Sequence, residues 1–87
     1  MKMTISQLQE LWSVLFPNRN APPESQFAIW LLRYDESIVR DAIARTAIKF
    51  EKLGGGMSDD YLSRFASATM GRLKQDATRE AVRAVIQ

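Results

Sequence analysis

Apolar residues recur every three or four positions along most of this chain, and proline and glycine residues interrupt the pattern. Such spacing places apolar residues on one face of an α-helix, whereas a half-buried strand would alternate them with polar residues. No alternating segment and no internal repeat is present in the sequence. We therefore expect an all-α fold, a compact bundle of four to five short helices that forms a single domain over residues 1–87.

The first two helices have clear boundary residues. Thr4 is placed to cap a helix over about residues 4–16, and Pro17 ends it because proline lacks the amide hydrogen that would continue the bonding. Pro22-Pro23 starts a second helix, since proline is well tolerated in the first helical turn. The apolar residues of these two helices are Ile5, Leu8, Leu11, Trp12, Leu15, Phe27, Trp30, Leu31 and Tyr34.

A third helix is expected over about residues 36–53, with Asp35 as its cap and the Gly54-Gly55-Gly56 run at its end. Ser58 caps a fourth helix. The Asp59-Asp60 pair then lies in the first turn, where carboxylates interact favourably with the helix dipole. The expected core faces comprise Val39, Ala42, Ile43, Thr46, Ala47 and Phe50 in the third helix and Tyr61, Leu62, Phe65, Ala68, Thr69 and Leu73 in the fourth.

The last part of the chain leaves two arrangements open. A continuous helix over residues 59–87 would be about 40 Å long, which exceeds the width of so small a bundle. Either the helix breaks near residues 74–78 and its late part, residues 76–87, packs on the core, or the late part projects. A projecting helix would need a partner for its apolar stripe, and a second copy of the chain is one candidate. The stripe consists of Ala77, Ala81, Val82, Val85 and Ile86.

The chain contains no histidine and no cysteine. Its serines therefore have no histidine to activate them as nucleophiles, and it has neither a disulfide framework nor a thiolate metal site. The Gly54-Gly55-Gly56 run lacks the lysine and Ser/Thr of a phosphate-binding loop. We expect a function carried out by the surface, with no enzyme activity, no metal and no cofactor.

Charge and hydropathy narrow the choice of partners. The 12 basic and 10 acidic residues give a net charge of +2 and are interleaved along the chain. That balance is typical of solvated helix surfaces and favours nucleic-acid binding only weakly. The residues that would carry such binding are Arg40, Arg45, Lys49 and Arg64. No signal-peptide run and no segment of membrane-spanning length occurs, so we expect a cytoplasmic protein that does not bind membranes.

Five local patterns follow one another in a specific order. The first helix ends in an aromatic-proline pair, Phe16-Pro17, and the next helix has a central tryptophan, Trp30. Leu31-Leu32-Arg33-Tyr34-Asp35 follows, and then Val39-Arg40-Asp41-Ala42-Ile43 begins a helix that ends in Lys49-Phe50. This order resembles the amino-terminal domain of phage replisome organisers, which are replicative-helicase inhibitors and loaders.

The resemblance covers roughly residues 8–65. It implies a small helical bundle followed by a flexible tail that engages the hexameric replicative helicase. Two features depart from the family pattern. The family usually has prolines where this chain has residues 54–58, and residues 76–87 have a helical pattern in place of the tail. No binding residue is carried over from the family.

The leading interpretation is a non-enzymatic protein-binding module. It would be a phage or mobile-element replication accessory protein that docks on a replicative helicase or a similar host complex. Its expected contact residues are Arg72, Lys74, Arg79, Val82, Arg83, Val85 and Ile86. Two alternatives remain open. One is a small helical DNA-binding module that uses the four basic residues named above, and the other is a phage-encoded inhibitor of a host defence or polymerase complex.

Overall fold

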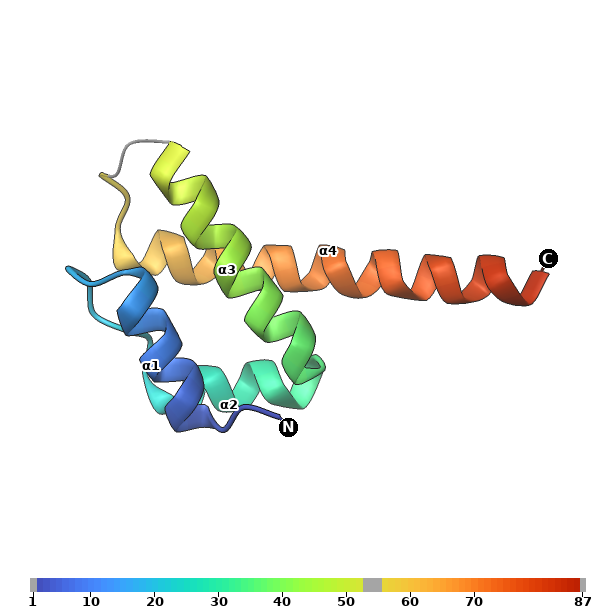
Figure 1. Cartoon of the computed structure of the whole chain (residues 1–87), viewed down its shortest axis with the longest axis horizontal. Helices are drawn as coiled ribbons and strands as arrows, with labels where there is room; N and C mark the ends of the chain where they lie inside the picture. The colour runs from blue at the N-terminus through green and yellow to red at the C-terminus, as the bar shows by residue number, and fades with distance from the viewer. Residues whose placement is uncertain (1, 53–55, 87) are drawn as a thin grey trace.

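The computed structural model describes residues 2–52 and 56–86, and these contain four helices and no strand. The helices are α1 (Ile5–Leu15), α2 (Glu24–Arg33), α3 (Glu36–Lys52) and α4 (Asp59–Ile86). Figure 1 shows α1, α2 and α3 gathered around the first half of α4. The all-α prediction is therefore confirmed, although α4, with 28 residues, is not a short helix.

The sequence identified the capping residues of α1 and α4 correctly. The Thr4 hydroxyl accepts a hydrogen bond from the Gln7 amide at 3.2 Å, and the Gln7 side chain accepts one from the Thr4 amide at 2.9 Å. This reciprocal capping box satisfies two amides that the helix itself leaves unpaired. At the start of α4, the Ser58 hydroxyl accepts a hydrogen bond from the Tyr61 amide at 3.0 Å.

The start of α2 differs slightly from the prediction. Pro23 is not the first helical residue of α2 but its N-cap, with an extended backbone at φ −67° and ψ 159°. The predicted end of the third helix at residues 53–55 lies outside the described residues. Gly56, which is described, has φ +87°, a left-handed conformation that residues with a side chain rarely adopt. It therefore suits the turn that leads into α4.

Aromatic side chains hold α1, α2 and α4 together. The Trp12 and Trp30 rings are stacked with centroids 6.2 Å apart, and Phe27 meets each of them edge-on. The Trp30 indole donates a hydrogen bond to the Ser67 hydroxyl of α4 at 2.6 Å. Each such ring buries a large apolar area and adds about 0.5–1.5 kcal/mol when its geometry with a neighbouring ring is favourable. The buried apolar core comprises Leu8, Trp12, Phe16, Phe27, Trp30, Val39, Ala42, Ile43, Ala47, Leu62, Ala66 and Met70.

The core face of α4 differs from the prediction at more than one position, and Tyr61, which was predicted as a core residue, is 44% exposed. Ala66 is buried and Ala68 is exposed, so the prediction of Ala68 as a core residue was wrong. The buried residues of α4 are Leu62, Ala66, Thr69 and Met70, which follow the helical spacing of three and four. The hydroxyl of Thr69 bonds to the Phe65 carbonyl one turn earlier at 2.9 Å, which removes the cost of burying it. Ala66 and Ala68 have the same side chain, so only the packing of the helices decides which of them is buried.

The second half of α4 projects from the bundle without a break. Residues 74–86, which we call the α4 extension, are all exposed. Figure 1 shows them running past the ends of α2 and α3, and the molecule is accordingly 47 Å long but only 28 and 19 Å across. The bundle ends where the Lys74 ammonium donates to the Arg33 carbonyl at 3.3 Å and lies 5.7 Å from the Tyr34 ring. Of the two arrangements that the sequence left open, the structure has the projecting one.

Candidate protein-binding surface

From residue 76 onward, the α4 extension carries all its charged residues on one side, while Lys74 lies in line with the uncharged residues of the other side. Each residue turns the helix by about 100°, so residues three, four and seven positions apart share a side. One side carries four charged residues in a row, Asp76, Arg79, Glu80 and Arg83. We call this the charged face. The opposite side, the uncharged face, consists of Ala77, Thr78, Ala81, Val82, Ala84 and Val85.

The uncharged face exposes large apolar side chains to solvent. Val82 is 52% exposed and Val85 is 86% exposed, although each would be buried in an ordinary helix-to-core contact. A shallow hollow of about 410 Å³ is lined by Lys74, Gln75, Thr78, Arg79 and Val82. The alanines between the valines keep the helix narrow, so another helix or the wall of a groove can approach closely.

The structure exposes all the predicted partner-binding residues but does not gather them on one side of α4. Val82 and Val85 belong to the uncharged face. Arg72 and Ile86 lie with Arg79 and Arg83 on the charged side, according to the helical spacing. Lys74 is held against the end of α2 by its contacts with Arg33 and Tyr34. The predicted set is therefore divided between two sides of the helix.

Three of the four residues predicted for nucleic-acid binding are paired with an acidic residue one turn away on the same helix. The pairs are Arg40 with Glu36 at 3.6 Å, Arg45 with Asp41 at 3.2 Å and Arg64 with Asp60 at 2.8 Å. Because Arg40 and Arg45 are five positions apart, they also point to different sides of α3. The partner of Arg40 is a buried carboxylate, although 3.6 Å is too long for a hydrogen bond. These four residues do not form a continuous positive surface.

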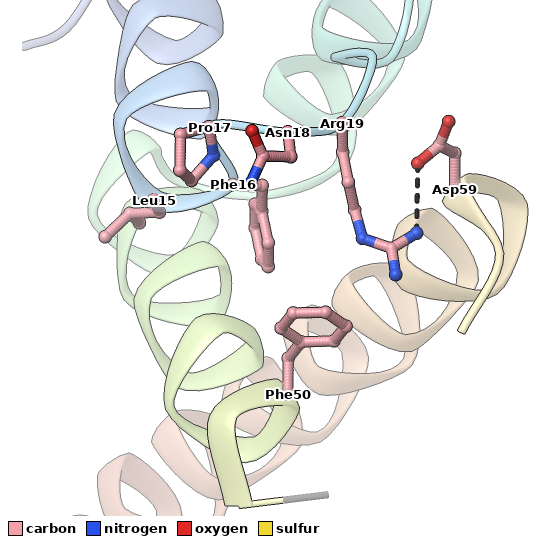
Figure 2. Close-up of a pocket in the computed structure, with 7 residues that line it drawn as sticks. All are labelled: Leu15, Phe16, Pro17, Asn18, Arg19, Phe50 and Asp59. Carbon is pink, nitrogen blue, oxygen red and sulfur yellow. Dashed lines mark hydrogen bonds and ion pairs between the residues drawn. The ribbon is translucent and has the colours of Figure 1, made fainter. Parts of the chain in front are cut away.

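A second hollow, of about 460 Å³, lies at the end of α1 and was not predicted (Figure 2). The Arg19 guanidinium reaches across it, 3.3 Å from the Asp59 carboxylate and 4.7 Å from the Phe50 ring centroid. Phe16 meets Phe50 edge-on at 5.8 Å. The full lining is Leu15, Phe16, Pro17, Asn18, Arg19, Phe50 and Asp59. The cation and the anion in this hollow already neutralise each other, so the arrangement ties the turn after α1 to α3 and α4.

Acidic side chains of the described residues are not clustered. Within residues 2–52 and 56–86, no group of three or more acidic side chains is placed to hold a metal ion. The adjacent carboxylates of Asp59 and Asp60 point away from each other, toward Arg19 and Arg64 respectively. None of the helices in these residues is long and apolar enough to cross a membrane.

Comparisons with protein-family models, with curated proteins and with solved structures find no match to this chain. Any function of the chain is therefore inferred from its surface. Large apolar side chains such as Leu32 are exposed elsewhere, but the α4 extension exposes three, Val82, Val85 and Ile86, within five residues.

Proposed function

We propose that the chain is a protein-binding module that acts by docking its α4 extension on a partner, and not by catalysis. The observation that carries this proposal is the exposure of every residue from 74 to 86 in a helix that separates its charged and uncharged sides. A monomer gains nothing from leaving valine side chains in water. Exposed apolar surface next to a polar rim is typical of interaction sites.

The expected mode of binding is a helix in a groove. In this mode the uncharged face enters an apolar groove of the partner, and Val82 and Val85 are the anchors. Full burial of a valine side chain contributes about 1.5 kcal/mol or more. Lys74 and Arg79 flank the same hollow and would lie at the rim, where charges guide orientation more than they add affinity.

The partner we propose is a replicative helicase or a similar large host complex, and the chain would then be a phage or mobile-element replication accessory protein. The resemblance of residues 8–65 to phage replisome organisers supports this partner. In those proteins a segment that follows the helical bundle engages the helicase. The α4 extension has the equivalent place in this chain, directly after the bundle. An inhibitor of a host defence or polymerase complex would use the same surface on a different partner.

A pull-down from host lysate tests the proposal. The baits are the intact chain, a chain lacking residues 76–87, and the double variant Val82→Ser/Val85→Ser. The matched control is Val14→Ser, because Val14 is a valine of α1 that is 70% exposed. We expect the intact chain and the control to recover a helicase and the other two baits to lose it. Equal recovery by all four baits would exclude the α4 extension as the docking element, and recovery of another complex would exclude the helicase.

A further inference from the structure

A line of arginine and aromatic side chains runs along α4 on the side opposite the uncharged face. Its members are Tyr61, Phe65, Arg72, Arg79 and Arg83, which follow one another at steps of four or seven residues. Such steps keep side chains on one side of a helix. The line is about 33 Å long, and the gaps between its arginines are about 10 Å and 6 Å along the axis. We call these three arginines the arginine stripe.

The arginines of this stripe differ from the other arginines in their electrostatic surroundings. Arg72, Arg79 and Arg83 are exposed, and none of the ion pairs found among the described residues involves them. Arg19, Arg40, Arg45 and Arg64 each have a carboxylate partner. A phosphate that contacts the stripe therefore does not have to displace an existing ion pair.

The aromatic end of the line has the features of a stacking platform. Tyr61 is 44% exposed, and its ring is stacked on Phe65 with centroids 6.3 Å apart. A shallow hollow of about 280 Å³ is lined by Tyr61, Arg64 and Phe65. The Lys49 ammonium of α3 lies 5.7 Å from the Phe65 ring and adds a positive charge next to it. An exposed aromatic face beside cations is a combination on which an unpaired base can stack.

We infer that this side of α4 binds single-stranded nucleic acid. The phosphates would follow the arginine stripe, and a base would stack on Tyr61. The three arginines, which are unpaired among the described residues, favour a polyanion as the ligand. The Tyr61–Phe65 pair favours a polyanion with unpaired bases, which is a single-stranded nucleic acid. The sequence-based candidates for nucleic-acid binding lie outside the arginine stripe, although Lys49 and Arg64 lie beside its aromatic end.

The surroundings of the stripe favour one strand over a duplex. A helix in the major groove lies between two phosphate backbones, so cations on both of its flanks strengthen its binding to a duplex. Here one flank of the stripe carries Glu80 and the other carries Val82, according to the helical spacing. Asp76 lies within the line, between Arg72 and Arg79, and lowers the local positive potential. A single backbone along the centre of the stripe avoids both flanks.

This inference does not depend on the proposed function. Arg72 and Arg83 of the stripe lie on a different side of the helix from Val85, and Arg79 alone also flanks the hollow beside Val82. Val82→Ser/Val85→Ser leaves all three arginines in place, so protein binding can be removed without changing the stripe. If the intact chain has one of the two binding activities and lacks the other, the idea that predicts the missing activity is wrong.

Fluorescence anisotropy with a labelled oligonucleotide tests the inference. The probes are oligo(dT) and oligo(U) of about 15 nucleotides, a length within the range of known single-strand sites, and a duplex of the same length. Increasing salt measures the number of phosphate contacts. We expect the intact chain to bind the single strands more tightly than the duplex, and the affinity to fall with salt. Comparison of the two single strands shows whether the 2′-hydroxyl contributes.

The variants locate the site. Arg72→Gln/Arg79→Gln/Arg83→Gln should lower the slope of log K against log salt by about 0.7 for each arginine removed. The control Arg40→Gln/Arg45→Gln removes paired arginines and should leave the slope unchanged. Tyr61→Ala should weaken binding about tenfold by loss of stacking. Absence of binding at low salt, preference for the duplex, or an equal loss in the control variant would each overturn the inference.

Discussion

Deletion of residues 76–87 should leave the stability of the bundle almost unchanged. In the structure residues 76–86 make no contribution to the core, and their large apolar side chains Val82, Val85 and Ile86 are 52%, 86% and 79% exposed. If the late helix were instead folded back on the core, burial of those three side chains would contribute about 4–9 kcal/mol. For the projecting arrangement we expect a loss of less than about 1 kcal/mol, as for other surface changes.

Urea unfolding followed by tryptophan fluorescence measures this difference. Trp12 and Trp30 both lie in the core, so the signal reports on the bundle and not on the α4 extension. The dependence of the unfolding free energy on urea should also change little, because it scales with the surface newly exposed on unfolding. Leu62→Ala is the positive control, since truncation of a buried leucine costs about 2–5 kcal/mol. A loss of several kcal/mol on deletion would refute the projecting arrangement and the docking proposal built on it.

Three further outcomes are expected. Ser67→Ala should cost about 1–3 kcal/mol in chemical denaturation, because it leaves the Trp30 indole N–H without its acceptor, whereas the exposed Ser6→Ala should be nearly neutral. Thr4→Ala should cost about 1 kcal/mol through loss of the cap, and an unchanged midpoint would show that the capping box does not matter. Asp76→Asn should raise single-strand affinity severalfold in the anisotropy assay by removing the one acid within the stripe, and a decrease would argue against phosphates in that position.

Local features of the structure were largely readable from the sequence. The hydroxyls of Thr4 and Ser58 cap the helices as predicted, and Trp12, Phe27 and Trp30 lie in the core. These features depend on interactions within one helical turn or on the general tendency of large apolar side chains to be buried. Neither requires knowledge of the neighbouring elements.

Partner choice between distant residues was not readable from the sequence. Nothing in the local pattern indicated that Arg19 would cross to Asp59, or that Ser67 would accept the hydrogen bond of Trp30, because each pair is some forty residues apart. The basic residues could be counted, but their ion pairs could not. For this reason the four residues chosen first for nucleic-acid binding include three that are neutralised on their own helices.

The sequence by itself determined that this chain is helical, where three of its helices begin, and which aromatic residues form its centre. Helical spacing, capping and the hydrophobic effect act over a few residues, so they can be read along the chain. The tertiary structure alone decided that α4 leaves the bundle after Lys74, because that depends on how far α2 and α3 extend beside it. The same stripe of alanine and valine would be core in a wider bundle. Here it is surface, because the elements that would cover it end first.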